Sequence, residues 1–424
     1  MIDRSIVPQI NPIDSVQLPP PETRKLDNGI PVHIFDLADQ NLIKIEVVFK
    51  SGSANQSAEL VAEFTANMMS EGTASKTALE IANQVDFYGS FLEHSVSKDF
   101  TSFTLYCLTK YVKESLEVFA DVLINPSFPE NELKIQLRND LQKFQVNSDK
   151  VSVLCRRAFT QRLYDPNHAY YGTISEESFN LNVNSLSDHY NANINFGAAE
   201  IFVSGYVKES VLENINALFG AEDVKKPNST SIDGVFSSLP DNVMIEKEGA
   251  MQSAIRIGKL LPFKRGEGDY VPFSMLNTIL GGYFSSRLMA NIREDKGYTY
   301  GIGSGVIANL ASTTFLISTE VNGESTQATL DEIYKEIKLL QTNLVSPEEL
   351  NRVKQYVVGS FLRNSDGPFD VCERFKSTLL FGMDYSYYES YLASVQDTTA
   401  EKILEMAQKH LNIDSMLEVV AGIK

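Results

Sequence analysis

Apolar residues recur at every second position between residues 43 and 50, at Ile43, Ile45, Val47 and Phe49. This alternation predicts a strand that turns one face to the core and the other toward water. Upstream, Asp27-Asn28-Gly29 has the composition of a tight hairpin turn. The folded part of the chain is therefore expected to start near Thr23, with strand pieces around this turn.

After residue 50 the apolar residues change to the spacing of helices. Apolar residues three and four positions apart predict helices over residues 58–70, ended by Gly72, and over residues 77–87. A strand is expected over residues 100–108, and then an amphipathic helix that stops at Asn125-Pro126. The next segment, SFPENEL, predicts a further helix with Ser127 or Asn131 as its cap and acidic residues near its positive end.

The order of elements then repeats. Ile255-Arg256-Ile257 resembles Ile43-Lys44-Ile45 at an offset of 212 residues, and two shorter matches follow at offsets of 210 and 217. Matches in one order at nearly one offset predict a duplicated domain. We expect an α+β fold of two homologous domains, each an antiparallel sheet with helices packed on one face. The domains are placed at 23–220 and 239–424, with an arm at 1–22 and a polar linker at 221–238.

Composition narrows the class of protein. The 424 residues carry a formal net charge of −18, so nucleic acid and anionic membranes are poor partners, whereas a basic or extended peptide is better tolerated. The three cysteines stand singly, as in a reducing compartment. The N-terminus lacks the apolar run of a signal peptide, and no stretch approaches the roughly 20 apolar residues of a membrane span. We expect a cytoplasmic protein, or a periplasmic one if a leader is missing from this version.

The segment at residues 281–300 carries the strongest candidate chemistry. Its apolar spacing predicts a helix that stops at Gly297, and Arg293 and Tyr300 flank this stop seven residues apart. Arg offers a fixed fork of donors and Tyr a single hydroxyl, so the pair suits a carbonyl oxygen or an oxyanion. On spacing alone, the alternative is a surface Arg beside a core Tyr.

The run SSRLMANIREDKGYTYGIGSGV resembles the second-domain signature of the insulinase, pitrilysin and mitochondrial processing peptidase family of zinc peptidases. The resemblance implies two homologous α+β halves that clasp a second such chain or chain half. It also implies that Arg293 and Tyr300 lie across a chamber from the zinc and hold the substrate backbone. Gly281, Gly282 and Ser285 would let a backbone approach beside the pair, or else serve packing.

Active members of that family carry His-x-x-Glu-His on the first long helix, where two histidines bind zinc and the Glu activates water. The matching segment here is ELVAEFTANMMSEGT, in which the three motif positions fall on Glu63, Ala66 and Asn67. Neither imidazole remains, and Ala66 cannot accept a proton. Glu63 and Asp140, near the family's distal ligand position, could hold only a hard cation weakly. His94 follows a Glu, but it lacks the first histidine and is expected to be structural or on the surface.

No metal or other cofactor is therefore expected in this chain, which should be inactive alone. The resemblance implies the non-zinc, substrate-binding subunit of a heterodimeric zinc metallopeptidase, with Arg293 and Tyr300 acting in trans on a peptide bound at a sheet edge. The expected partner is a homologous zinc-bearing subunit, or a second copy of this chain. The alternative is a catalytically inert structural or assembly protein of the same fold.

Overall fold

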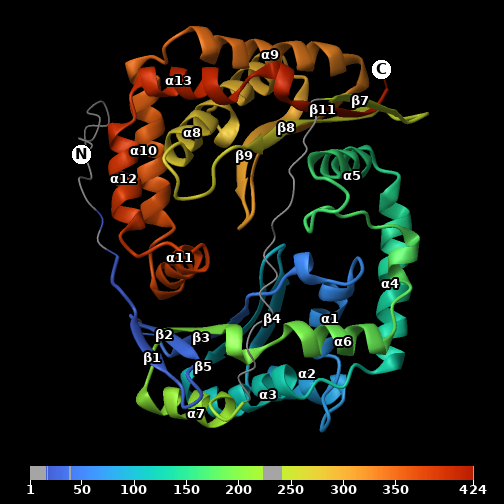
Figure 1. Ribbon diagram of the computed structural model, residues 1–424, viewed down its shortest axis with the longest axis vertical. Coiled ribbons are helices and arrows are strands. Elements are labelled where there is room, and N and C mark those ends of the chain that lie inside the picture. Colours follow the sequence, from blue (N-terminus) through green and yellow to red (C-terminus); the bar gives the residue numbers. More distant parts are fainter. Residues whose placement is uncertain (1–15, 17, 38–39, 223–240, 424) are drawn as a thin grey trace, which may run out of the picture.

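A computed structural model describes residue 16 and residues 18–37, 40–222 and 241–423. Most of the expected arm at 1–22 and almost all of the expected linker at 221–238 lie outside these described residues. Two sheets occupy opposite halves of the molecule, with α4 and α5 along one side and α10 and α12 along the other (Figure 1). The domain boundaries themselves stay predictions.

The first sheet has six strands in the order β1-β2-β6-β3-β5-β4 and is antiparallel except for the pair β2 and β6. The strands are β1 (Glu22–Lys25), β2 (Pro31–Asp36), β3 (Leu42–Phe49), β4 (Phe91–Val96), β5 (Thr101–Leu108) and β6 (Ala199–Gly205). As expected, Asp27-Asn28-Gly29 forms a turn between β1 and β2, where Gly29 adopts a φ of +90°. The helices of this half are α1 (Val61–Met69), α2 (Ala78–Phe87), α3 (Val112–Ile124), α4 (Glu130–Ser148), α5 (Val151–Leu163), α6 (Val183–Asn193) and α7 (Glu209–Phe219).

The second sheet repeats this plan with five strands in the order β7-β11-β8-β10-β9. They are β7 (Asp241–Glu246), β8 (Gln252–Leu261), β9 (Thr299–Ala308), β10 (Thr313–Asn322) and β11 (Leu417–Gly422), and the single parallel pair is β7 and β11. The helices are α8 (Tyr270–Asn277), α9 (Thr326–Thr342), α10 (Pro347–Arg363), α11 (Pro368–Leu380), α12 (Tyr387–Asp397) and α13 (Ala400–His410). Two homologous α+β halves are thus confirmed.

The strand register refines the repeat. Ile45 stands opposite Val203, two residues before β6 ends at Gly205, and Ile255 stands opposite Val420, two residues before β11 ends at Gly422. Ile255 therefore corresponds to Ile45. The sequence match had paired it with Ile43. Because side chains alternate with a period of two, this two-residue difference keeps every apolar residue on the same face.

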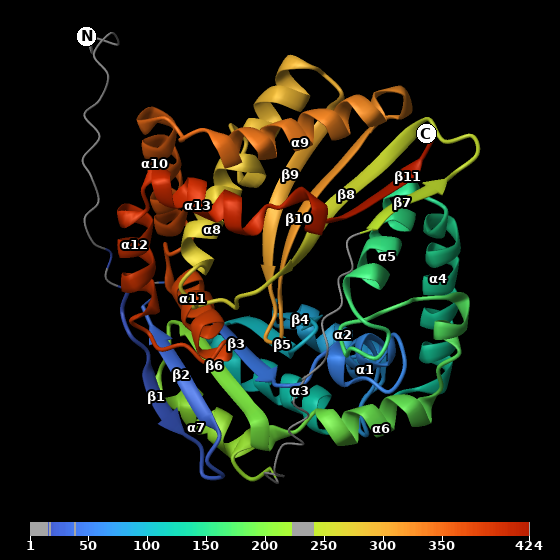
Figure 2. The same cartoon turned by 45° about the horizontal axis from the view of Figure 1, so that its top comes forward.

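The two halves exchange helices. From the first half, α5 packs on β8 and β11, where the Cys155 thiol donates to the carbonyl of Val419 at 3.2 Å. From the second half, α11 packs on β2 and β6, with Cys372 buried against the first sheet (Figure 2). The expectation that β3 has one face nearer water is therefore wrong, because α11 covers that face and every residue of β3 after Leu42 is buried.

Buried charges fix α11 to β3. Lys376 of α11 donates to both carboxylate oxygens of Glu46 at 2.7 and 2.8 Å, and Lys44 lies 3.1 Å from Glu46 and also contacts Glu373. The side chains of Glu46 and Lys44 are only 4% and 7% exposed. Burial by itself lowers the pKa of Lys44, but Glu46 and Glu373 outweigh it and raise that pKa above its ordinary value.

A second junction joins the β9–β10 turn to the first half. The buried carboxylate of Asp99 accepts from the backbone N–H of Leu310 at 2.9 Å and contacts the hydroxyl of Tyr170. That hydroxyl in turn accepts from the N–H of Ala311 at 3.1 Å. These bonds fix the distal end of β9, the strand that begins beside Arg293 and Tyr300.

One helix start was predicted wrongly. Helix α4 begins at Glu130 directly after Pro129, and neither Ser127 nor Asn131 caps it. The fixed φ of Pro129 prepares the chain for the first turn, and Glu130 and Glu132 lie near the positive end of the helix dipole. Among the described residues, no helix combines the length and apolar character needed to cross a bilayer.

Candidate functional site

The predicted helix before Gly297 exists, but its hydrogen bonds follow a π pattern over Met289–Asp295. Such π segments are rare and are frequent at functional sites. Met289 and Ile292 are buried in the second core, and Gly297 reverses the chain at a φ of +67° before β9 starts. The side chain of Tyr300 is 95% exposed, so the alternative reading of a core Tyr is wrong.

A β-bulge gives Tyr300 this exposure. Thr299 pairs with Val321 and Ile302 pairs with Thr319, so Tyr300 and Gly301 together stand opposite one residue, Glu320. The Thr299 hydroxyl accepts from the Gly301 N–H at 3.1 Å and donates to the Glu320 carbonyl at 2.7 Å. The Thr319 hydroxyl donates to the Gly301 carbonyl at 2.9 Å. Threonine hydroxyls thus satisfy backbone groups that the bulge removes from the ladder, and the bulge re-aims the tyrosine.

Arg293 has no acidic partner among the described residues. Its guanidinium lies 5.0 Å from the ring centroid of Phe284, which is itself 63% exposed. Within the part of the chain that the structure describes, no carboxylate lies within ion-pair distance of Arg293 and no hydrogen bond joins it to Tyr300. In a chain with an excess of acidic residues, an arginine with this freedom is available to a ligand.

Gly281 and Gly282 have packing roles. A Cβ on Gly281 would lie 2.6 Å from the backbone nitrogen of Ser304, and one on Gly282 would lie 3.0 Å from the amide nitrogen of Asn277. Close approach of this helical segment to β9 therefore requires glycine at position 281. Ser285 is exposed. The substrate-binding role of these three residues stays a prediction.

The degenerate motif lies on α1, as expected. Glu63 and Asn67 are four residues apart on one helix face, while Ala66 is 2% exposed and belongs to the core. Burial lowers the pKa of His94 on β4, so its ring is neutral near pH 7, and Nε2 lies 2.5 Å from the Asn67 side-chain oxygen. Sequence spacing could not show that β4 brings a histidine to the third motif position.

The acidic positions come together but do not form a metal site. Burial raises the pKa of Glu63, and the nearby charge of Asp140 raises it further. Asp140 is already paired with Lys143 at 2.7 Å. Over the described ranges, no group of three or more His, Cys, Asp or Glu side chains lies close enough to hold a metal ion. These residues do not fit a hydrolytic zinc ion.

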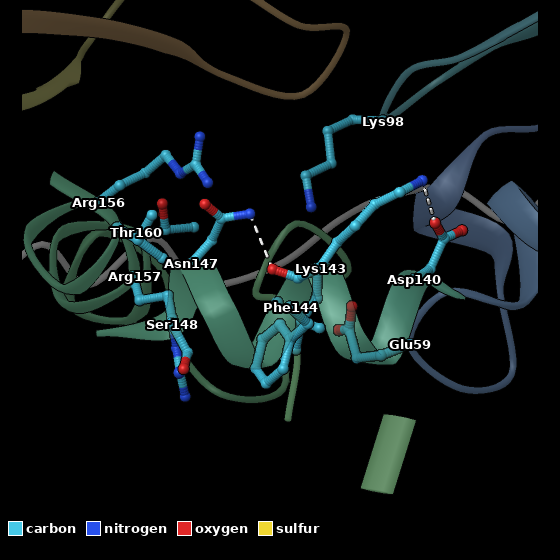
Figure 3. Close-up of a pocket in the computed structure, with 13 residues that line it drawn as sticks. Glu59, Lys98, Asp140, Lys143, Phe144, Asn147, Ser148, Arg156, Arg157 and Thr160 are labelled. Atoms are coloured by element: carbon cyan, nitrogen blue, oxygen red, sulfur yellow. Dashed lines mark hydrogen bonds and ion pairs between the residues drawn. The ribbon is translucent and has the colours of Figure 1, made fainter. Parts of the chain in front are cut away.

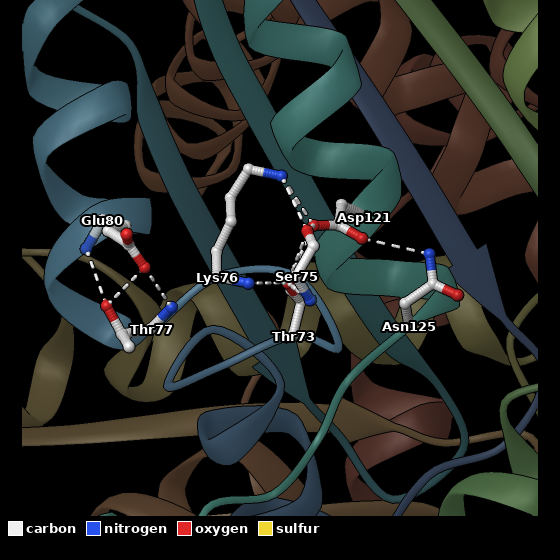
Figure 4. A network of polar contacts seen from close by, with 7 residues as sticks. All are labelled: Thr73, Ser75, Lys76, Thr77, Glu80, Asp121 and Asn125. Carbon is white, nitrogen blue, oxygen red and sulfur yellow. Dashed lines mark hydrogen bonds and ion pairs between the residues drawn. The ribbon is translucent and has the colours of Figure 1, made fainter.

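The Gly72-Thr73 pair after the motif has a structural role. A Cβ on Gly72 would lie 2.6 Å from the ring of Pro129, so glycine is required there. The hydroxyls of Thr73 and Ser75 and the ammonium of Lys76 all donate to one oxygen of Asp121 on α3, at 2.8 to 2.9 Å (Figure 4). This polar network fixes the loop that joins α1 to α2.

Two family models match the chain. The model described as "Insulinase (Peptidase family M16)" matches residues 37–193, which include α1, and "Peptidase M16 inactive domain" matches residues 180–357, which include Arg293 and Tyr300. An uncharacterized zinc protease, YmxG, of Bacillus subtilis is 22% identical over 93% of this chain and 96% of its own length. A "non-peptidase homolog YmxG" of Helicobacter pylori is 21% identical over 90% and 89%.

Solved structures share the fold. A peptidase M16 inactive domain from Pseudomonas fluorescens superposes with a TM-score of 0.86 at 26% identity, over 95% of this chain and 98% of that one. A protease from Helicobacter pylori gives a TM-score of 0.85 at 19% identity, over 96% of this chain and all of that one. With both halves matched by models of one family, the chain belongs to the insulinase family of peptidases, family M16.

Proposed function

We propose that this chain is the non-zinc, substrate-binding subunit of a heterodimeric zinc metallopeptidase that acts on peptides. The observation that carries the proposal is that Arg293 and Tyr300 have unused hydrogen-bond donors within the described residues. Both side chains are hydrogen-bond donors, and neither has an acceptor among the described residues. Tyr300 lies at the start of the edge strand β9, and Arg293 lies on the π-helical segment that precedes this strand. Donors held in place without an internal partner suit an acceptor that arrives with a ligand.

The chemistry of the pair supports this role. The guanidinium of Arg293 can hold a peptide carbonyl through its fork of donors, and the hydroxyl of Tyr300 can donate to the oxygen on which charge develops during hydrolysis. The bulge fixes the backbone of Tyr300 in advance, so little ordering is needed on binding. The partner's zinc would supply the activated water.

A free sheet edge near the degenerate motif offers a place for the peptide. β4 ends the first sheet, pairs with β5 alone within the described strands, and exposes alternate side chains such as Phe91, which is 68% exposed. An extended peptide can pair with such an edge through its main chain, which tolerates varied sequences. Tyr300 also lines a cavity of about 420 Å³ together with Arg256 and Glu320, which offers polar contacts next to this tyrosine.

Zinc must then come from another chain, because Glu63, Ala66 and Asn67 lack the two imidazoles and the general base of a hydrolytic zinc site. The name "non-peptidase homolog" given to the Helicobacter pylori relative fits a family member that does not cleave peptides alone. A second copy of this chain would bring no zinc motif, so a self-dimer would be inert. We therefore favour a homologous subunit with an intact His-x-x-Glu-His motif as the partner.

The test is peptide cleavage with zinc present, first with this chain alone and then with the zinc-motif homologue from the same genome. Arg293→Ala and Tyr300→Phe are compared with Arg363→Ala and Tyr356→Phe, two exposed residues on α10. We expect cleavage only in the mixture, a loss of about 100-fold in kcat for the first two variants and none for the controls. A stable complex without cleavage would refute the proposal and favour the inert assembly protein.

A further inference from the structure

A cavity of about 420 Å³ lies beside the degenerate motif, between α4, α5 and the turn that follows β4 (Figure 3). Four cationic side chains line it, those of Lys98, Lys143, Arg156 and Arg157, against two carboxylates, those of Glu59 and Asp140. The cavity wall is thus locally positive in a chain whose net charge is −18.

Three of the four cations have no acidic partner within the part of the chain that the structure describes. Lys143 is held by Asp140 at 2.7 Å. For Lys98, Arg156 and Arg157, no carboxylate of the described residues lies within 4.0 Å. Figure 3 shows Lys98 reaching from the turn after β4 toward α4. Burial lowers the pKa of Lys98, and the more distant carboxylates of Glu59 and Asp99 only partly offset it. An ammonium group removed from water in this way gains much from an anion placed beside it.

Part of the remaining cavity wall is apolar, although Asn147, Ser148 and Thr160 also line it, and this apolar part selects the kind of anion. Phe144, Val153 and Ile174 line the same cavity, and the guanidinium of Arg157 lies 6.0 Å from the ring centroid of Phe144. A small inorganic anion would leave these side chains uncovered. A carboxylate carried on a peptide can cover them with its own methylene groups or neighbouring side chains.

We propose that this cavity binds a peptide carboxylate, either an acidic side chain or the C-terminus, with Lys98 and Arg156 as its main partners. The ligand class rests on the proposed peptide-binding function. Lys98 lies two residues beyond the end of β4 at Val96, so a peptide paired along the edge of β4 would run toward the cavity. The net negative charge of the chain favours basic peptides at long range. At contact distance the cations that line the cavity dominate, and they favour a carboxylate.

The proposal is tested by fluorescence anisotropy with this chain alone and a set of labelled decapeptides. One arm moves a single Glu along an uncharged sequence with an amidated C-terminus, a second replaces Glu by Gln, and a third has Gln with a free C-terminus. The protein variants are Lys98→Met and Arg156→Gln, with Lys113→Gln on α3 as a control for the loss of one positive charge outside the cavity. Circular dichroism confirms that each variant is folded.

We expect the Glu or the free-carboxylate peptide to bind about tenfold more tightly than the neutral one, and 0.5 M salt to reduce this difference. Lys98→Met and Arg156→Gln should abolish the preference, and Lys113→Gln should keep it. Equal affinity for all peptides, an equal loss in the control, or binding of inorganic phosphate in place of peptide carboxylates would overturn the inference. Because no partner is present, the result is independent of whether the mixture cleaves peptides.

Discussion

Replacing Asp121 by Asn tests whether the polar network after α1 holds the first half together. Burial of this carboxylate would by itself raise its pKa, but hydrogen bonds from Lys76, Thr73, Asn125 and Ser75 outweigh burial and lower the pKa to about 2 from the ordinary 3.8. One pKa unit corresponds to about 1.4 kcal/mol, so the charged form of Asp121 contributes about 2 kcal/mol to folding at neutral pH. Its side chain is 15% exposed, so solvent screens little of this.

The pH dependence gives the sharper test. Because the pKa of Asp121 is lower in the folded than in the unfolded chain, its contribution is complete above about pH 4 and is lost as the pH falls toward 2. Urea denaturation at pH 7 should therefore show Asp121→Asn to be about 2 kcal/mol less stable than wild type, with a smaller difference at pH 3. Asp188→Asn, at an exposed position, should stay within about 0.5 kcal/mol. An unchanged stability, or a difference independent of pH, would refute the reasoning.

Three further outcomes are expected. Glu46→Gln removes the buried carboxylate that Lys44 and Lys376 share and leaves them only the more exposed Glu373, so it should cost about 3 kcal/mol in urea denaturation. Gly281→Ala places a methyl group against the backbone of β9 and should lower stability by about 1–3 kcal/mol, whereas Gly301→Ala, which has open space, should lower it by less than about 1 kcal/mol in thermal unfolding. Thr319→Val keeps its volume but removes a hydroxyl that holds the bulge, so kcat in the two-chain mixture should fall as for Tyr300→Phe, with KM nearly unchanged.

Much of the fold follows from local pattern. Alternation predicted β3, helical spacing predicted α1 and α2, and the repeat predicted a second half of the same plan. The exchange of α5 and α11 was not predictable, because it pairs residues such as Glu46 and Lys376 that lie 330 positions apart. No local pattern carries that information. In the sequence, a lysine in an alternating strand gives the same pattern whether it is exposed or, like Lys44, buried.

For the candidate site too, the sequence predicted one part and could not predict another. The segment around Arg293 and Tyr300 was found from its sequence, yet the exposure of Tyr300 depends on a bulge that hydroxyls on two strands hold. The contact of His94 with Asn67 joins a strand to a helix 27 residues away. Residue types therefore indicated the chemistry, whereas cross-strand and strand-to-helix contacts determined which groups are free.

The packing of the first half explains why substitutions at the degenerate motif would not simply restore a zinc site. Ala66 is packed in the core, so a glutamate there would bury a carboxylate without a partner, at a cost of several kcal/mol. A histidine in place of Asn67 would lose the bond to His94, and Asp140 is already engaged by Lys143. Ala66 thus has a packing role and Asn67 a hydrogen-bonding role of its own. Arg293, which stacks on Phe284, and the exposed Tyr300 make no side-chain hydrogen bond or ion pair within the described residues, and for that reason the chemistry of this chain is to be sought around the start of β9.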